Sequence, residues 1–129
     1  MRATLADAKA GIDEVGHVHA HGLSTRESDA QEAQAIREMF ASRSGGVPVT
    51  AAKSYFGNLG AGSGLVELIA SVLAMNHDAL FPILNYETPD PACPIQAVAE
   101  RGTSPGRSFL NLSVTPQGQA SVVMVRAFE

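Results

Sequence analysis

The sequence is short of positive charge, of cysteine and of long apolar runs. Nine Lys and Arg stand against thirteen Asp and Glu, a net charge of −4, so the chain lacks the basic surface that binds a phosphate backbone. Its single Cys93 cannot close an internal disulfide, which suits a reducing compartment. The most apolar run, residues 65–75, contains Glu67 and is well short of the roughly 20 residues of a bilayer span. We therefore expect a cytoplasmic protein with no nucleic-acid partner and no membrane partner.

The residues that are present suffice for one folded unit. Hydrophobic residues make up 45% of the 129 residues and charged residues 17%, a composition that buries a core and is too apolar for a disordered segment. A chain of this length is near the usual size of one domain. We therefore expect residues 1–129 to form a single domain.

The order of the apolar patterns predicts an α/β fold. Alternating apolar runs indicate strands, and runs with helical spacing indicate helices. The expected elements are a short helix over 3–10, a strand over 15–20, a helix that begins near Ser28 or Asp29 and ends before Gly45, a strand over 47–52, a helix over 65–75, and a hairpin of strands over 109–114 and 120–125. Apolar residues occupy nearly every side of the helix over 65–75, which predicts that it is buried all round.

Glu67 lies in that apolar helix, where an isolated carboxylate is costly unless it is paired. Lys53 is the nearest candidate cation in the sequence, placed at a strand end just before the glycine-rich turn that leads into the helix. We therefore expect a buried pair of Lys53 and Glu67. The alternative is that the Glu67 side chain reaches solvent along a groove.

Three further features each have a structural and a functional interpretation. His17, His19 and His21 alternate, so in a strand they share one face; they are either ordinary strand residues or ligands gathered around zinc. The glycines over 57–64 either hold phosphate at a helix N-terminus or allow close packing against a neighbouring strand or subunit. Cys93 lies in a proline-rich connection without a helix N-terminus to lower its pKa, which favours a structural or incidental thiol over a nucleophile.

Three motifs follow one another along the chain. VHAHGLST at 18–25, followed by Asp29 and Glu32, is similar to a motif NAHGTST with trailing acidic residues. KSYFGNLGAGSG at 53–64 resembles KSxxGHxxGAAG, and FPILNYETPDP at 81–91 resembles PPTxNLxxPDP. These are motifs of the β-ketoacyl-acyl-carrier-protein synthases, the condensing enzymes of fatty-acid and polyketide synthesis. The order and separations of the three also match, so the chain resembles that family.

The resemblance implies a fold and an activity. The fold would be the C-terminal half of a thiolase-like architecture, α/β with a mixed sheet and helices on both faces. Because these enzymes are much longer, the chain would be the C-terminal domain of a longer protein, with a face exposed that the missing half normally covers. The implied activity is acyl transfer with decarboxylative condensation, a transferase reaction of 3-oxoacyl-ACP synthases. The segment that bears the family's nucleophilic cysteine is absent from this chain.

The resemblance also assigns roles to single residues. His21 takes the place of one of the family's two active-site histidines, and its Nε2 could donate to the malonyl thioester oxygen. Asn58 takes the place of the second, where an amide can donate a hydrogen bond but cannot carry a charge. Lys53 completes this catalytic set. The charged network that supports it would consist of Glu67, Asp29 and Glu32.

One stretch departs from the family. Where the family has the glycine-rich loop NSFGFGGxN, this chain has RSFLNLSVT at 107–115, in which Leu110 and Leu112 would need new room. With Asn58, this departure favours a divergent or non-catalytic homologue. Because the nucleophilic cysteine is missing, we expect the isolated chain to be inactive. The alternatives are a non-catalytic subunit similar to a chain-length factor or scaffold and, less favoured, a zinc-binding domain.

The resemblance further implies the partners. They are acyl carrier protein, acyl and malonyl thioesters and the remaining half of the polypeptide, with a homodimer in the full-length protein. No cofactor and no metal is expected. An exposed apolar face predicts that the isolated chain dimerises or aggregates.

Overall fold

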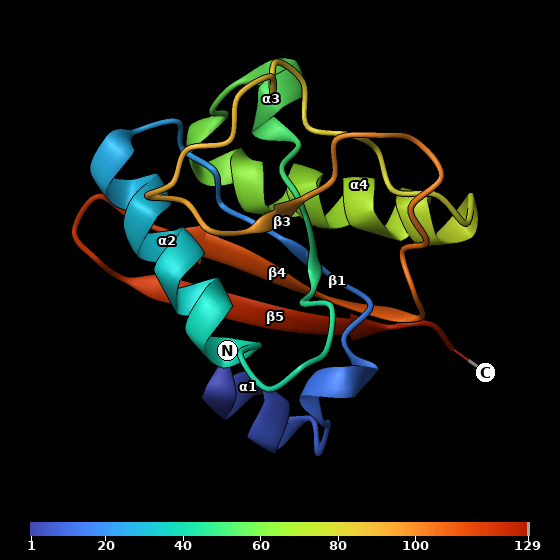
Figure 1. Cartoon of the computed structure of the whole chain (residues 1–129). Helices are drawn as coiled ribbons and strands as arrows, with labels where there is room; N and C mark the ends of the chain where they lie inside the picture. Colours follow the sequence, from blue (N-terminus) through green and yellow to red (C-terminus); the bar gives the residue numbers. More distant parts are fainter. Residues whose placement is uncertain (129) are drawn as a thin grey trace.

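A five-stranded mixed sheet carries the other elements (Figure 1). The computed structural model describes residues 1–128. The strand order is β3-β2-β1-β4-β5, with β1 to β4 parallel to one another and β5 antiparallel to β4. In chain order the elements are α1 (Arg2–Asp7), η1 (Ile12–Glu14), β1 (His17–His19), α2 (Arg26–Met39), β2 (Pro48–Thr50), α3 (Lys53–Phe56), η2 (Gly60–Gly62), α4 (Ser63–Asn76), β3 (Gln96–Ala97), β4 (Ser108–Val114) and β5 (Ala120–Arg126).

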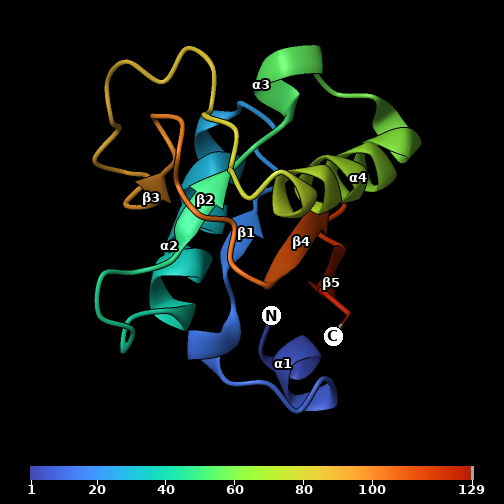
Figure 2. The same ribbon diagram turned by 90° about the vertical axis from the view of Figure 1, so that its right-hand side faces the viewer.

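Helices cover both faces of this sheet (Figure 2). On one face, Leu5 of α1 and Ile36 of α2 pack with the strands into the main hydrophobic core. On the other face, α4 lies across β4 and β1. The α/β prediction of a mixed sheet with helices on both faces is therefore confirmed.

The alternation of side chains along β1 separates an apolar face from a polar one. Val18 pairs with Leu110 of β4, and both belong to the core on the side of α1 and α2. Successive residues of a strand point to opposite faces, so His17 and His19 point toward α4, where both rings contact the hydroxyl of Ser71. The histidines are therefore fully buried between the sheet and α4.

Helix α4 buries its polar side and exposes its apolar side. The buried positions are one turn or so apart and carry small or polar residues, Ser63, Glu67, Ser71 and Ala74. In contrast, Leu65 is 65% exposed and Leu73 50% exposed. The prediction that this helix is buried all round is wrong, because within residues 1–128 only the face with small residues packs on the sheet. No helix in this part of the chain is both long and apolar enough to cross a membrane.

Several elements differ from the sequence prediction. Helix α1 ends at Asp7 and strand β1 covers only His17–His19, and the short helix α3 was not predicted. Helix α2 begins at Arg26 with Thr25 as its N-cap, ahead of the predicted start at Ser28 or Asp29. The Asp29 carboxylate instead accepts a hydrogen bond from the Ser24 amide before the helix. Strand β3 was not predicted, because it is very short and lies in a proline-rich connection.

Where the family has its glycine-rich loop, this chain has strand β4, as the apolar run over 109–114 predicted. Strand β4 is paired with β1 on one side and β5 on the other, and the connecting turn lies at 115–119. Leu110 and Leu112 are buried in the main core, so the fold already has room for them. The hairpin predicted over 109–114 and 120–125 is therefore confirmed, and the alternate leucines Leu110 and Leu112 fill the sheet face under α1 and α2.

Candidate functional site

The ends of two adjacent strands bring the first candidate residues together. Strand β1 is followed by His21, and strand β2 is followed by Lys53, the first residue of α3. The two strands are parallel neighbours, and the carboxyl ends of parallel strands lie at the same edge of a sheet, where sites commonly form. Both residues are 7% exposed. The site therefore begins as a buried histidine beside a buried lysine.

The Lys53 ammonium has a partner for each of its three N–H donors. It donates to the His21 carbonyl oxygen at 2.6 Å, faces His21 Nδ1 at 3.3 Å and forms an ion pair with Glu67 Oε1. The two paired side chains are 4% and 0% exposed. The predicted pair of Lys53 and Glu67 is confirmed, and the alternative of a solvated Glu67 is wrong.

This contact selects one tautomer of His21. An ammonium can only donate, so Nδ1 of His21 is the accepting nitrogen and the ring proton sits on Nε2. Burial, and then the positive charge of Lys53, lower the pKa of His21. Among residues 1–128, nothing hydrogen-bonds to Nε2. The arrangement yields a neutral imidazole with one N–H donor available to a ligand.

Two carboxylates of α2 hold the backbone after β1. Glu32 accepts hydrogen bonds from the amides of His21 at 2.6 Å and Gly22 at 2.9 Å, and Asp29 accepts one from the Ser24 amide at 3.2 Å. Burial is the main cause that raises the pKa of Glu32. Glu32 thus holds the main chain at His21 and Gly22, and Asp29 holds it at Ser24.

Asn58 makes its hydrogen bonds to residues outside this cluster. It is exposed, and its Oδ1 accepts hydrogen bonds from the Gly60 amide at 3.1 Å and the Ser63 hydroxyl at 3.0 Å. Ser63 lies one turn before Glu67 on the buried side of α4. Asn58 is therefore anchored to the same helix face but, within residues 1–128, has no bond to His21 or Lys53. Its Nδ2 has no partner in the described part of the chain and can donate.

His17 and His19 are already engaged by the protein. Both contact the Ser71 hydroxyl, His17 at 3.0 Å and His19 at 2.7 Å. Burial lowers the pKa of His17 to about 4 and, with the charges of His17 and Lys53, that of His19 to about 3. Residues 1–128 contain no group of three or more His, Cys, Asp or Glu placed to hold a metal ion. The zinc interpretation of the three histidines therefore has no support. Ser71 was missed in the sequence, where a serine in an apolar helix gives no signal.

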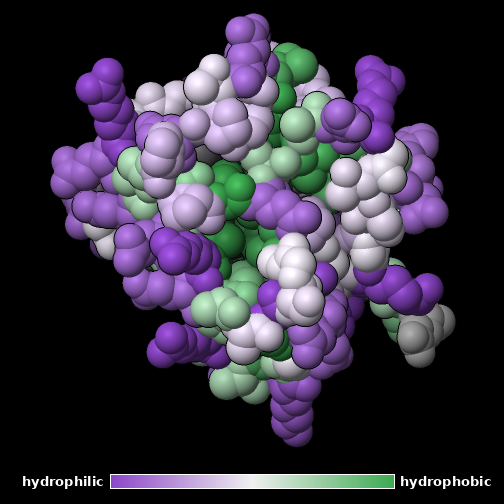
Figure 3. All heavy atoms as spheres, in the orientation of Figure 1, coloured by the Kyte–Doolittle hydropathy of each residue, from purple (hydrophilic) through white to green (hydrophobic). Residues whose placement is uncertain are grey.

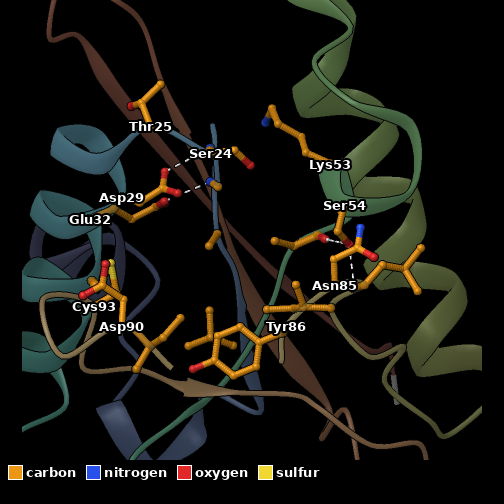
Figure 4. Close-up of a pocket in the computed structure, with 18 of the residues that line it drawn as sticks. Ser24, Thr25, Asp29, Glu32, Lys53, Ser54, Asn85, Tyr86, Asp90 and Cys93 are labelled. Atoms are coloured by element: carbon orange, nitrogen blue, oxygen red, sulfur yellow. Dashed lines mark hydrogen bonds between the residues drawn. The ribbon is translucent and has the colours of Figure 1, made fainter. Parts of the chain in front are cut away.

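A cleft of about 560 Å³ adjoins the site. Figure 4 shows Asp29 and Glu32 on its α2 side, with Lys53 and Ser54 opposite. On the face that carries α2 and β3, hydrophobic atoms gather near the centre and hydrophilic residues surround them (Figure 3). Neither His21 nor Asn58 lines the cleft. The cleft and the histidine site are therefore neighbours that share Lys53, which lines the cleft and contacts His21.

Cys93 lies on the wall of that cleft, near Asp90. Burial, and then the negative charges of Asp90 and Asp29, raise the pKa of the Cys93 thiol. A nucleophilic cysteine needs surroundings that lower its pKa. The environment therefore agrees with a structural or incidental thiol.

At two positions of the glycine cluster, the backbone conformation explains why the residue is glycine. Gly57 and Gly60 have φ values of +74° and +62°, which favour glycine. A Cβ at Gly57, Gly60 or Gly62 would meet nothing within 4 Å, whereas one at Gly64 would contact Ser113 of β4. Close packing against a strand of this chain is therefore limited to Gly64. Packing against another polypeptide stays a prediction.

Comparison with known proteins gives relatives of one kind. Residues 1–87 match the family described as "Beta-ketoacyl synthase, C-terminal domain". The chain is 38% identical over 94 residues to nodulation protein E of a Rhizobium species. It is 36% identical over 98 residues to the tetracenomycin polyketide synthase ketoacyl synthase alpha subunit of Streptomyces glaucescens. With 3-oxoacyl-[acyl-carrier-protein] synthase 2 of Synechocystis it shares 35% over 94 residues.

These three matches cover 72%, 76% and 73% of this chain but only 23% of each relative. The chain thus spans about a quarter of the length of the curated relatives it matches.

Solved structures agree with the sequence matches. The ishigamide ketosynthase/chain length factor superposes with a TM-score of 0.91 at 26% identity, over 99% of this chain and 32% of that one. A type II polyketide synthase acyl-carrier protein in complex with its ketosynthase superposes with a TM-score of 0.91 at 30% identity. The match covers 98% of this chain and 31% of that one. A β-ketoacyl synthase from Burkholderia phymatum superposes with a TM-score of 0.87 at 27% identity, over 100% of this chain and 31% of that one. The expected thiolase-like fold is confirmed, and the chain belongs to the C-terminal domain family of the β-ketoacyl synthases.

Proposed function

We propose that this domain supplies part of a condensing site that joins an acyl thioester to a malonyl thioester. In this reaction the malonyl group loses CO₂, the resulting enolate attacks the acyl carbonyl, and a cysteine thiolate leaves. Negative charge develops on the malonyl thioester oxygen, so the reaction needs hydrogen-bond donors held in place beforehand. The observation that carries the proposal is the buried His21 ring, whose Nδ1 faces Lys53 and whose Nε2 is left for a ligand.

His21 would be the first donor. A neutral imidazole with its proton on Nε2 can donate to the thioester oxygen as charge develops there. The ring does not have to reorganise, because Lys53 holds Nδ1 and Glu32 holds the His21 amide. Glu67 in turn fixes the Lys53 ammonium, and Asp29 supports the Ser24 amide beside the loop.

Asn58 would be the second donor. Its Oδ1 is occupied by two hydrogen bonds, which orients the amide and leaves Nδ2 as the free group. A carboxamide can stabilise negative charge by donation, although it cannot bring a positive charge of its own. Asn58 would reach the substrate from the segment that precedes α4.

The acyl group would be held by a cysteine outside these 129 residues. Cys93 has a raised pKa and lies in the neighbouring cleft, so it does not suit that role. The isolated chain should therefore not condense substrates. Substrates would arrive on acyl carrier protein, an expectation supported by the solved relative that is bound to such a carrier. The rest of the polypeptide and, in the full-length protein, a second copy would complete the assembly.

The test is CO₂ release from malonyl-carrier protein by the polypeptide that joins this domain to the cysteine-bearing segment. We expect His21→Ala to lower the rate about 100- to 1,000-fold, the usual effect of losing one donor to a developing oxyanion. His77→Ala changes an exposed histidine at the end of α4 and should leave the rate unchanged. A His21→Ala protein as fast as the unchanged protein would refute the role of His21.

A second function is a subunit without turnover, similar to a chain-length factor or scaffold. The exposure of Asn58 and the lack of a bond from it to His21 within residues 1–128 favour this alternative. Incubation of the joined polypeptide with radiolabelled acyl-carrier protein distinguishes the enzyme from the subunit without turnover. Label on a cysteine outside this chain supports the enzyme, no label supports the subunit, and label on Cys93 contradicts both.

A further inference from the structure

Four hydrogen bonds form a chain beneath the candidate site, from the Ala52 amide to the Pro105 carbonyl. The Ala52 amide donates to His19 Nε2 at 3.1 Å, and His19 Nδ1 lies 2.7 Å from the Ser71 hydroxyl. The same hydroxyl lies 3.0 Å from His17 Nε2, and His17 Nδ1 lies 2.8 Å from the Pro105 carbonyl oxygen. Both rings and the Ser71 side chain are fully buried, so water does not compete for these groups.

The two ends of the chain fix the position of every proton in it. A carbonyl oxygen only accepts, so His17 carries its proton on Nδ1; a backbone amide only donates, so His19 Nε2 is an acceptor. If both rings are neutral, His19 donates from Nδ1 to Ser71, and Ser71 donates its one proton to His17 Nε2. This pattern satisfies each donor and each acceptor once. A proton added to either ring would break it.

The Ala52 end of this chain lies next to the catalytic candidates. Ala52 is buried and immediately precedes Lys53, at the point where β2 ends and α3 begins. The hydrogen bond from its amide to His19 connects the end of β2 to a side chain of β1. The bond therefore holds the residue directly before Lys53, whose ammonium contacts His21 and Glu67.

We propose that His19 is a positioning residue, which sets the place of Lys53 by accepting the hydrogen bond of the Ala52 amide on Nε2 and donating from Nδ1 to Ser71. The inference rests on the proposed function, because the purpose of a fixed Lys53 is to orient His21. His19 is fully buried and is not part of the cleft wall. It therefore acts through Lys53 and not on a substrate.

The first test needs only the unchanged protein. Selective ¹⁵N labelling of histidine distinguishes protonated from accepting ring nitrogens by NMR. We expect His19 and His17 to be neutral at pH 7 with the proton on Nδ1 in both. A proton on Nε2 of His19, or a charged His19 ring, would overturn the proposal. This outcome is independent of catalysis, so it cannot be confused with failure of the proposed condensing role.

The second test compares two variants of His19 by hydrogen exchange of the Ala52 amide. His19→Leu removes the acceptor, and we expect exchange about 5- to 150-fold faster, the range for losing one buried hydrogen-bond partner. His19→Gln keeps an acceptor near the Nε2 position and should stay close to the unchanged protein. Equal exchange in the two variants would contradict this hydrogen bond.

A readout at His21 separates positioning from a merely structural role. If His19 acts through Lys53, the ring-nitrogen signals of His21 shift in His19→Leu and return in His19→Gln. His77→Gln is the matched control, and it should move neither the Ala52 amide nor His21. Unchanged His21 signals in a folded His19→Leu protein would show that His19 does not position Lys53.

Discussion

Lys53 and Glu67 form a charged pair in which both side chains are buried, with exposed fractions of 4% and 0%. Removing one partner of such a pair leaves the other as an uncompensated buried charge. We expect Glu67→Gln to lower the free energy of unfolding by about 3–5 kcal/mol, measured by urea denaturation. Glu87→Gln on an exposed connection is the control. A loss below about 0.5 kcal/mol would mean that the pair is solvated, as surface pairs are.

His17 and His19 make stability depend on pH. Their pKa values in the fold are lowered to about 4 and about 3, whereas a histidine of the unfolded chain titrates near 6.5. Between these values the unfolded state binds more protons, so stability is complete above about pH 6.5 and falls as the pH drops. We expect a loss of about 1.4 kcal/mol per pH unit for each histidine below that point.

Urea denaturation at several pH values between 7 and 5 measures this slope. His77→Gln alters an exposed histidine and should keep the slope of the unchanged protein. A free energy of unfolding that stays level from pH 7 to pH 5 would show that the two rings are not held neutral by burial.

The start of strand β1 is pressed against the turn before β4. A Cβ on Gly16 would lie 2.2 Å from the Pro105 carbonyl oxygen and 2.7 Å from Gly106 Cα, contacts with backbone that cannot yield cheaply. We expect Gly16→Ala to destabilise the fold by about 1–3 kcal/mol or more, as measured by thermal or urea unfolding. Gly62→Ala, where a Cβ meets nothing within 4 Å, is the control and should be neutral or stabilising. Equal stability of the two variants would contradict this packing.

The order of the longer helices and strands was predictable because each carries its own local pattern, whereas the short α3 and β3 were not predicted. The hairpin of β4 and β5 follows from two apolar runs around a turn sequence, and the paired Lys53 and Glu67 follow from the cost of an isolated buried charge. The bonds of Ser71 could not be predicted, because they depend on which residues of the sheet face α4. The exposure of the apolar side of α4 was mispredicted. An apolar helix sequence indicates that its side chains favour burial, but it does not show which part of the protein buries them.

In the candidate site, the residues that contact one another were easier to predict than their arrangement. His21, Lys53 and Glu32 share one cluster as the motifs implied. Asn58 has no hydrogen bond to His21 within residues 1–128, and its position depends on the path of the 57–62 segment, whose glycines allow many conformations. The sequence alone does not determine that path.

At the scale of the whole molecule, the uncovered side of α4 is the main feature. Leu65, Ile69 and Leu73 of α4 are about half exposed or more, and Tyr55 and Phe56 of the neighbouring α3 are also exposed. Contiguous apolar surface of this kind marks an interface in a soluble protein. We therefore expect this side of α4 to be an interface.

We therefore expect the isolated chain to dimerise or aggregate as its concentration rises. Analytical sedimentation over a range of concentrations measures this, and the double variant Leu65→Gln, Leu73→Gln should shift the chain toward the monomer. Val123→Gln on β5 changes one exposed apolar residue away from α4 and serves as the control. A clean monomer at every concentration would contradict the prediction.

The protonation of the His21 ring decides whether this domain can act as described. The contact with Lys53 predicts a neutral ring at pH 7, with Nδ1 accepting and the proton on Nε2. Histidine-selective ¹⁵N NMR on the unchanged protein reads both nitrogens, and Lys53→Met should abolish the preference for this tautomer. A neutral ring with its proton on Nδ1 would leave no Nε2 donor for an enolate, and a charged ring would contradict the predicted acceptor at Nδ1.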